Sequence, residues 1–507
     1  MSDTYTRPPH AQPERMRPLI IAPKPTNMDA TVLIDEYSES LTAMSVSTPL
    51  LAQAIPVPLL GRRKSPVSAQ SFPPEILSYI FLLGQDGSLG HCAPVLPGDA
   101  SLPIELSVSK VNSYWRNVAI STRLLWCRIT ISVDSWRECV YAYLNRAAGS
   151  LLDVRIEAAN NNGCDLDSSI LDAVCSRVHS WRRCVIELET EEEAHPVIAR
   201  LCDVAASNLQ YMSLSLSDFE GALRAFHIFR GGTPALSFVR LGGLGVRFFH
   251  PPLNATTTLH LDQTNFTIFR YDSFRQMLMS TENLVHLSVY GDIIGAVPWP
   301  QANESTLIRM RSLKSLRICG FSGYVYSGLL LNLEAPLLDS LILKGAIDSD
   351  LDLFLSPSTS SKFTELRHLT FCDFSLSIES QYTQLFMSLP SVTEFTSLSL
   401  DLHAPHILRY LATPLQIDGS APWPNLRRLN MFLGFPEQSL IKNVVEWRIS
   451  VNRPLAKLCF ITEEELFLDL ADREWLNEHV DIEAVESFCE YWPRDLRFED
   501  KDDYMLR

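Results

Sequence analysis

The 507-residue sequence has no uninterrupted apolar run close to the roughly 20 residues that a membrane-spanning helix needs. Its most apolar early segment, residues 50–60, is interrupted by Pro56 and Pro58. Residues 1–18 also lack the apolar stretch of a secretory signal. These absences predict a protein of the cytoplasm or the nucleus that has no membrane partner.

Cysteine pairs with metal-binding spacing are missing as well. The chain has 11 cysteines, spread from Cys92 to Cys489, and none of them forms a CxxC pair. An odd number of scattered cysteines indicates neither a disulfide framework nor a zinc site. We therefore expect no bound metal, and we expect most of the thiols to be reduced and buried.

Positive charge is scarce, because 43 Lys and Arg residues stand against 59 Asp and Glu residues and give a net charge of -16. The excess of acid is concentrated in residues 463–507, which have 16 acidic and 5 basic residues. A nucleic-acid-binding protein needs a basic stripe, and no segment of this chain provides one. DNA and RNA are therefore not expected partners.

Motifs that position a nucleophile, a catalytic metal or a phosphate are also absent. The sequence contains no G-x-S-x-G, H-E-x-x-H, G-x-x-x-x-G-K-[ST] or G-x-G-x-x-G. Asp348, Asp350 and Asp352 alternate with other residues in a way more typical of a helix start or a loop than of a carboxylate site. His403 and His406 are separated by a proline that is expected to break the helix needed to align them as ligands. The sequence predicts no catalytic residue, no cofactor and no enzymatic activity.

What the chain does have is the composition of a globular protein, with 46% apolar and 20% charged residues. Residues 1–65 differ from the rest, because they contain nine of the 31 prolines and no sustained apolar period. We expect this segment to be a disordered arm.

The first strong structural signal is the segment SFPPEILSYIFLLG, residues 71–84. Pro74 suits the first turn of a helix, and the apolar residues Ile76, Leu77, Ile80 and Phe81 follow at helical spacing. This pattern predicts an amphipathic helix, which is followed by a loop rich in glycine and proline over residues 84–103.

Helical spacing resumes over residues 106–121, where Val111, Trp115, Val118 and Ala119 are predicted to share one face. A β-type run follows at residues 128–133. Residues 66–130 are therefore predicted to form a small helical module.

This module resembles the F-box domain, in the form common in large fungal F-box-like families. The residues that carry the resemblance are Phe72-Pro73-Pro74-Glu75-Ile76-Leu77, Ile80-Phe81, Leu106-Ser107-Val108, Val111, Trp115-Arg116, Ala119 and Ser121-Thr122-Arg123-Leu124-Leu125-Trp126. The sequence departs from the family pattern at Phe72, where leucine is typical, and at Asn112 and Tyr114. The alternative is a small three-helix bundle, which shows the same periodicity.

An F-box docks onto a Skp-type adaptor that is joined to a cullin, so the resemblance implies that this module buries an apolar face against such an adaptor. The adaptor-binding residues that it implies are Phe72, Pro73, Ile76, Leu77, Ile80, Phe81, Leu106, Val111 and Trp115. A charge introduced there by Leu77→Asp is expected to abolish adaptor binding and to leave the rest of the chain folded.

Beyond residue 150 the chain repeats an LxxLxL unit about every 28 residues, within the range of leucine-rich repeats. The middle apolar positions of the units are Val154, Cys184, Met212, Val239, Leu259, Leu287, Leu316, Leu341, Leu369, Leu398, Leu429 and Leu458. Such units stack as short parallel strands that bury alternate side chains. Residues 131–462 are therefore predicted to form an α/β solenoid that resembles leucine-rich repeats.

The solenoid is expected to be irregular, because the asparagine usually found after the strand is missing. An ordinary α/β domain is the alternative. Residues 463–507 are predicted to form an acidic helical cap on the last repeat, and a tail that binds a basic partner is the alternative for them.

Side chains that alternate with the buried ones are expected to face the concave surface of the solenoid. The candidate target-binding residues on this face are Tyr211, Phe238, Arg240, His260, His286, Arg317, His368, Arg428 and Asn430. A mixture of aromatic, histidine and arginine side chains suits a protein partner, whose identity the sequence does not reveal.

The resemblance and the repeats together suggest a substrate-recognition subunit of a Skp–cullin–F-box ubiquitin ligase. The helical module would bind the adaptor, and the repeat surface would bind a target protein. The alternative hypothesis is a repeat-based protein-interaction scaffold that has no ubiquitin role.

Overall fold

The computed structural model describes most of the chain from residue 72 to residue 484. The described ranges are 72–87, 103–133, 135–157, 166–217, 227–243, 251–263, 269–295, 297–321, 323–356, 362–374, 376, 379–398, 404–415, 419–432, 438–461 and 470–484. All of them belong to one compact unit, Ser68–Arg507. The predicted arm at residues 1–65 lies outside the described residues, and so does the last part of the predicted acidic cap.

The described unit begins with three α-helices and a short 3₁₀ helix. They are α2 (Pro74–Gly87), α3 (Ile104–Val111), α4 (Ser113–Ser121) and η2 (Arg123–Trp126). Pro74 is the first residue of α2, where a missing backbone N–H leaves no hydrogen bond unmade. The amphipathic helix is confirmed, but it continues to Gly87 and so includes the start of the predicted loop.

The second predicted helical segment is two helices instead of one. Asn112 has an extended backbone (φ −161°, ψ 176°), and its side-chain oxygen accepts a hydrogen bond of 2.8 Å from the backbone N–H of Trp115. Asparagine favours this N-cap position, so it ends α3 and begins α4. The single face predicted for Val111, Val118 and Ala119 is therefore wrong, because Val111 is exposed while the other two are buried.

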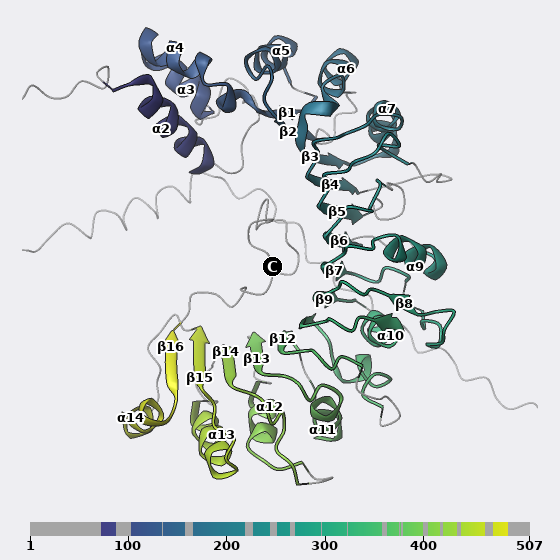
Figure 1. Ribbon diagram of the computed structural model, residues 1–507, viewed down its shortest axis with the longest axis vertical. Coiled ribbons are helices and arrows are strands. Elements are labelled where there is room, and N and C mark those ends of the chain that lie inside the picture. Colours follow the sequence, from purple (N-terminus) through teal and green to yellow (C-terminus); the bar gives the residue numbers. More distant parts are fainter. Residues whose placement is uncertain are drawn as a thin grey trace, which may run out of the picture. The chain divides into compact units, whose positions relative to one another are not determined.

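Fourteen parallel strands form one continuous sheet in the order β1-β2-β3-β4-β5-β6-β7-β9-β11-β12-β13-β14-β15-β16. The strands are β1 (Arg128–Ile131), β2 (Leu152–Glu157), β3 (Trp181–Leu188), β4 (Tyr211–Leu216), β5 (Phe238–Gly243), β6 (Thr258–Asp262), β7 (His286–Tyr290), β9 (Ser315–Cys319), β11 (Ser340–Lys344), β12 (His368–Cys372), β13 (Glu394–Leu398), β14 (Arg428–Phe432), β15 (Lys457–Ile461) and β16 (Asp481–Ala484). The strands of this sheet follow one another in sequence order, interrupted only by the short strands β8 and β10, which pair separately; this is the topology of a solenoid (Figure 1). The predicted array of parallel strands is confirmed.

The register of the sheet agrees with the predicted repeat positions except at one unit. Phe395, and not Leu398, pairs with Leu369 on one side and with Leu429 on the other. In this unit the position two residues after Phe395, where the repeat expects an apolar side chain, is occupied by Ser397. The nearby leucines fit the repeat pattern better than the residues of strand β13 do, so the sequence pattern placed the unit there. The sheet also extends one strand beyond each end of the predicted units, through β1 and β16.

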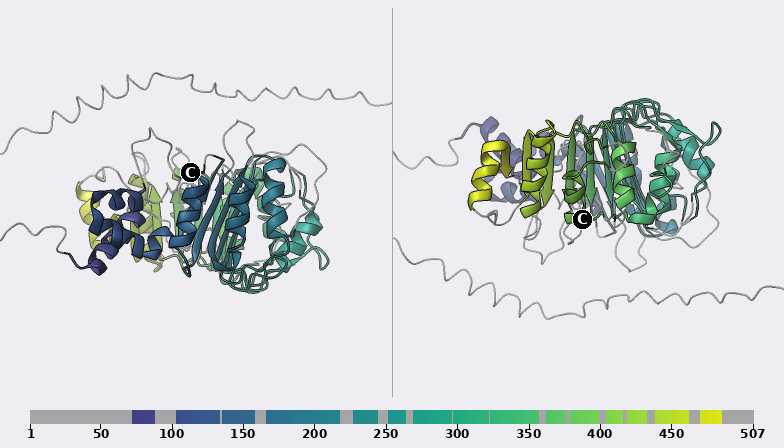
Figure 2. Two further views of the ribbon diagram at one scale, coloured as in Figure 1. Left: turned by 90° about the horizontal axis from the view of Figure 1, so that it is seen from above. Right: turned by 90° about the horizontal axis from the view of Figure 1, so that it is seen from below.

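Helices return the chain between many of the strands. They are α5 (Arg137–Arg146), α6 (Ser168–Cys175), η3 (Val178–Ser180), α7 (Glu191–Leu201), α9 (Tyr271–Met279), α10 (Tyr324–Asn332), η4 (Asp348–Asp350), α11 (Glu379–Ser388), α12 (Ala404–Leu411), α13 (Gln438–Ser450) and α14 (Leu470–His479). A separate pair of short strands, β8 (Ile308–Arg309) and β10 (Leu333–Glu334), lies among the connections. Within the described unit the α-helices cover one face of the sheet, and the opposite face is concave (Figures 1 and 2).

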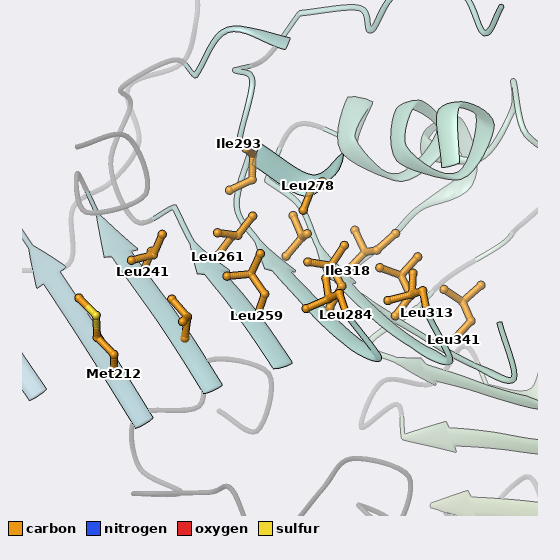
Figure 3. Packing of buried hydrophobic residues seen from close by; sticks show 14 of the residues in the cluster. Met212, Leu241, Leu259, Leu261, Leu278, Leu284, Ile293, Leu313, Ile318 and Leu341 are labelled. Carbon is orange, nitrogen blue, oxygen red and sulfur yellow. The ribbon is translucent and has the colours of Figure 1, made fainter. Parts of the chain in front are cut away.

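The hydrophobic core lies between the sheet and these helices. Two alternating positions of each inner strand point into it, as Leu259 and Leu261 do in β6, where both side chains are 0% exposed. Figure 3 shows such side chains following one another from Met212 to Leu341. Burying one leucine side chain stabilises the folded state by about 1.5–3 kcal/mol, so each repeat adds stability through its own buried side chains.

The helical module packs directly against the first repeat. Trp126 is fully buried, and its indole N–H donates a 2.8 Å hydrogen bond to the backbone oxygen of Ala119. The buried carboxylate of Glu105 accepts a 2.7 Å hydrogen bond from Tyr143 of α5, whose ring meets Trp126 edge-on. A buried polar contact of this kind fixes the orientation of the two parts, so the module is the N-terminal end of the solenoid.

Candidate partner-binding faces

An exposed apolar row runs along helix α2. Ile76, Tyr79, Ile80 and Leu83 are between 46% and 62% exposed, and their spacing places them on one side of the helix. Phe72, just before the helix, is 39% exposed. Large apolar side chains gathered on one exposed helix face are typical of an interaction site. These five residues are called the α2 row below.

The nine predicted adaptor-binding residues divide into three groups by exposure. Phe72, Pro73, Ile76, Ile80 and Val111 are exposed, Leu106 and Trp115 are half-buried, and Leu77 and Phe81 are buried. Leu77 is 1% and Phe81 2% exposed, so both belong to the core of the module and their prediction as contact residues is wrong.

Two members of the α2 row, Tyr79 and Leu83, were not predicted from the sequence. The signal for them is present, because they continue the helical spacing that begins at Ile76.

The nine candidate target-binding residues all lie on strands, at positions that alternate with core residues. The register places Arg240 beside His260 and Tyr211 beside Phe238 across neighbouring strands. They are less exposed than expected of a recognition surface. Tyr211, Phe238, His260, Arg317 and Asn430 are buried, whereas Arg240, His286, His368 and Arg428 are half-buried.

Six of these residues come from strands β4 to β9 and form one patch together with Asp262 and Ser288. This central patch consists of Tyr211, Phe238, Arg240, His260, Asp262, His286, Ser288 and Arg317. The rings of Tyr211 and Phe238 stack with centroids 4.5 Å apart, and the His260 ring lies 4.9 Å from that of Phe238. With Val185, the two stacked residues form an apolar cluster separate from the main core.

The charged side chains of the central patch are held in fixed positions. The Arg240 guanidinium forms an ion pair of 2.5 Å with the Asp262 carboxylate. Arg317 is 2% exposed, and its Nε and Nη2 atoms each lie 3.2 Å from the hydroxyl oxygen of Ser288. Sequence reasoning missed Asp262, which occupies the next alternate position of its strand after His260.

Both histidines of the central patch are neutral at neutral pH. Burial lowers the pKa of His260 well below its ordinary value, and the charges of Arg317 and Arg240 lower it further. Burial lowers the pKa of His286 to about 4, with smaller contributions from Lys314 and Arg317. The patch therefore combines stacked rings with neutral imidazoles and guanidinium groups.

Lowering the pH from 6.5 to 4.5 is expected to destabilise the repeats partly through these histidines. The unfolded chain binds protons at His260 and His286 near pH 6.5, whereas the folded chain binds them only at lower pH. Stability is therefore lost as the pH falls through this window. After allowance for the partial exposure of His286, its contribution is about 1–2 kcal/mol.

Urea unfolding of wild-type and His286→Gln proteins at pH 7.0 and pH 4.5 measures this loss. The variant should lose less stability on acidification than the wild type. An equal loss in the two proteins contradicts the assignment. A His179→Gln variant is the control, because that histidine is exposed in η3 and lies outside the central patch.

A second polar group lies on the same face over strands β12 to β14. The buried Glu394 carboxylate accepts a 2.6 Å hydrogen bond from the Asn430 side-chain amide, which also lies 2.9 Å from the Thr396 hydroxyl. His368 and Arg428 lie 3.5 and 3.6 Å from the same carboxylate. Charges of both signs balance here, so this group has no clear preference for the sign of a ligand.

The residues considered for catalysis or metal binding do not converge. Asp350 ends η4, and one of its carboxylate oxygens accepts a 2.9 Å hydrogen bond from the Ile347 backbone, as expected of a turn residue. Pro405 does not prevent a helix, because α12 begins at Ala404 and tolerates proline in its first turn. His403 lies outside the described residues.

Within the described ranges, no three or more His, Cys, Asp or Glu side chains form a group that could hold a metal ion. The part of the chain that the structure covers also has no helix with the length and apolar character needed to cross a membrane.

Comparison with known proteins does not assign the chain to a family. No family model matches the sequence, and no curated protein matches it. Among solved structures, the chain is similar to one in the crystal structure of the Rad7 and Elc1 complex in yeast. The identity is 12%, 90% of this chain and 98% of that chain are covered, and the TM-score is 0.28.

A second similar structure is that of a TLR13–ssRNA13 complex. The identity is 11%, with 70% of this chain and 77% of that chain covered and a TM-score of 0.17.

Proposed function

We propose that the chain is a substrate-recognition subunit of a Skp–cullin–F-box ubiquitin ligase. The observation that carries this proposal is the α2 row, an apolar helix face exposed at the N-terminal end of a parallel-strand solenoid. The row contains three of the residues that the F-box resemblance implies at the adaptor, Phe72, Ile76 and Ile80. The solenoid offers a separate face for a target protein.

In this role the protein catalyses no reaction and acts by holding a target protein close to the ubiquitin-charged enzyme. The contacts of Tyr143 in α5 with the buried Glu105 carboxylate and with the Trp126 ring join the docking helices to the first repeat. A target held by the repeats is then kept at a defined distance from the adaptor and from the ubiquitin-charged enzyme that the cullin recruits. Restricting the approach of two reactants in this way lowers the entropic part of the barrier.

Replacing Ile80 with aspartate is expected to weaken adaptor binding about 30-fold or more, which corresponds to the loss of an interface hot spot. Ile80 is 46% exposed, so the charge remains in contact with water in the unbound protein. The stability of the protein should change by less than about 1 kcal/mol. Isothermal titration calorimetry of the full chain with a purified Skp-type adaptor measures the binding, and urea unfolding measures the stability.

The matched control is Leu337→Asp, which changes a residue that is 50% exposed in the turn before β11. It should bind the adaptor like the wild type. Unchanged binding by Ile80→Asp shows that the α2 row is not the docking face. If the wild-type chain binds neither the adaptor nor its cullin complex, the ligase role is wrong and the repeat scaffold without a ubiquitin role remains.

A further inference from the structure

Four exposed apolar side chains gather at the turns that follow strands β9 and β11. Phe321 lies between β9 and helix α10, and Tyr324 is the first residue of α10. Ile347 and Leu353 lie on either side of η4. The four side chains are between 44% and 67% exposed. Helix α10 contacts η4, so the two pairs belong to one surface, and large apolar side chains gathered in this way are typical of an interaction site.

The two turns are held together by hydrogen bonds of buried side chains. The hydroxyl of the buried Tyr326 accepts a 2.8 Å hydrogen bond from the backbone N–H of Gly320 and donates one to the backbone oxygen of Lys344. The Ser327 hydroxyl donates a 2.5 Å hydrogen bond to the backbone oxygen of Asp350. Because these contacts fix the backbone of both turns, the surface is formed before a partner binds and little entropy is lost in ordering it.

Carboxylates border the apolar side chains. Asp350 is half-buried against the turn before α10, where a Cβ at Gly323 would overlap one of its carboxylate oxygens. Gly323 also has a φ of 81°, so only glycine allows this close approach. Asp352 is exposed, and Asp292 accepts a 3.1 Å hydrogen bond from the backbone N–H of Phe321. Burial raises the pKa of Asp350 and the charges of Asp292 and Asp352 raise it further, so the three carboxylates lie close together.

Lys344 offsets only part of this negative charge. It lies at the end of β11, and its charge acts on the Cys319 thiol together with the charges of Asp373 and Asp292. With the carboxylates of Asp350 and Asp352, these charged groups comprise four carboxylates and one ammonium. A partner that covers the surface is therefore favoured when it brings positive charge.

We propose that this surface binds a segment of the target protein in which lysine or arginine accompanies apolar side chains. The surface is called the η4 patch and consists of Phe321, Tyr324, Ile347, Asp350, Asp352 and Leu353. The proposal deepens the proposed function and rests on it, because it assigns a surface and a chemistry to the target. It places target binding at the ends of the strands instead of on the concave face, where Tyr211, Phe238 and Arg317 are buried.

The chemistry of the patch defines each part of such a segment. An apolar side chain of the target would pack on Phe321 and Leu353, the two most exposed of the four apolar residues. A guanidinium or ammonium group would bind the carboxylates of Asp350 and Asp352. The rings of Phe321 and Tyr324 attract the same cations. An acidic segment meets like charges instead and is rejected.

Short random peptides displayed on phage serve as the probe for the target segment. They are selected for binding to the full-length wild-type protein and depleted of those that bind a Leu353→Ser variant. Leu353 is 67% exposed, so this variant should keep the wild-type midpoint in urea unfolding. The remaining peptides should be enriched in lysine or arginine together with large apolar residues. Recovery of acidic peptides, or of none that prefer the wild type, overturns the proposal.

Fluorescence anisotropy of a selected peptide measures the apolar part of the contact. The Leu353→Ser variant should bind the peptide at least tenfold more weakly than the wild type. The matched control is Leu337→Ser, which makes the same change at a 50% exposed residue in the turn before β11, at the opposite end of the strands. It should bind like the wild type. Equal weakening by the two substitutions contradicts the assignment of the contact to the η4 patch.

The electrostatic part is measured with Asp352→Asn. Asparagine keeps an oxygen that can accept the 2.6 Å hydrogen bond from Gln381, so the change removes only the charge. Binding should weaken about threefold, and the difference should shrink at high salt. Glu282→Gln is the control, because it removes one negative charge from an exposed position before β7. Equal effects of the two variants indicate only a general attraction to an acidic protein and overturn the proposal.

A second copy of the chain is another occupant that these variants distinguish. Size-exclusion chromatography with light scattering should show a monomer of the wild-type protein. A dimer that Leu353→Ser dissociates means that the patch joins two copies, which contradicts the proposal.

Failure of this inference is distinguishable from failure of the proposed function. The Leu353→Ser variant retains the α2 row and should bind a Skp-type adaptor with the wild-type Kd. If the wild-type chain does not bind the adaptor, the ligase role is wrong, and the peptide measurements still decide whether the η4 patch binds a basic apolar segment.

Discussion

The free energy of unfolding of the C-terminal repeats is expected to fall by about 4 kcal/mol when Arg448 is replaced with methionine, since orphaned buried carbonyls cost about 1–3 kcal/mol each. Arg448 lies in α13 and is 0% exposed. Its Nε donates to the backbone oxygen of Arg453 at 3.0 Å, and Nη1 donates to that of Pro422 at 3.1 Å. Nη2 donates to the backbone oxygens of Trp423 and Leu426, each at 3.2 Å.

These hydrogen bonds tie helix α13 to the turn that leads into strand β14. Burial lowers the pKa of the Arg448 guanidinium to about 10, so the group remains charged at neutral pH and donates charge-assisted hydrogen bonds. Methionine fills a similar volume but has no donor. The side chain therefore stabilises the turn through its hydrogen bonds and not only through its volume.

Urea unfolding followed by circular dichroism measures the effect, with Arg453→Met as the control. Arg453 accepts from Arg448 only through its backbone oxygen, and its own side chain is exposed, so its replacement should change stability by less than about 0.5 kcal/mol. An Arg448→Met protein with the wild-type midpoint shows that water or a neighbouring group satisfies the carbonyls instead.

The sequence was sufficient to predict most of the sheet because strand burial is a local signal. Two apolar residues separated by one position, repeated at a regular interval, identified every inner strand except β13 in its correct register. Of the two outer strands, β1 has the apolar pair Ile129 and Ile131 within the predicted β-type run, whereas β16 lacks such a pair. Strand β16 reads DIEA and contains one large apolar residue, so acidic neighbours concealed it.

The candidate sites were less predictable, because periodicity shows which side chains share a face but not what covers that face. In α2 the residues Ile76, Leu77, Ile80 and Phe81 are all apolar, and they divide into an inward pair and an outward pair. Only the packing of α3, α4 and η2 distinguishes the two pairs. In the same way, alternation identified Tyr211 and Arg317 as members of one face but did not reveal their burial.

Leu77→Asp is therefore expected to act in a different way from the one that the sequence suggests. Leu77 is 1% exposed, and an aspartate there places a carboxylate in the apolar core of the module. We expect the module to lose about 4 kcal/mol or more of stability, which is typical of an unpaired buried charge. Adaptor binding would be lost because the docking helices unfold.

The effect should extend into the first repeat. The Gln85 side chain of α2 donates a 3.0 Å hydrogen bond to the backbone oxygen of Leu125, and the Arg128 side chain of strand β1 donates to the backbone oxygen of Gln85. Unfolding of α2 removes both contacts and exposes the buried Trp126. The repeats further from the module are expected to remain folded, whereas the first repeat is expected to be destabilised.

Limited proteolysis and circular dichroism distinguish this outcome from that of Ile80→Asp, which differs by only three positions in the same helix. Leu77→Asp should lose helical signal and be cleaved rapidly between residues 72 and 130, whereas Ile80→Asp should resist cleavage like the wild type. Both should fail to bind the adaptor. A Leu77→Asp protein with wild-type helicity that loses only adaptor binding would place Leu77 at the interface and exchange the inward and outward faces assigned to α2.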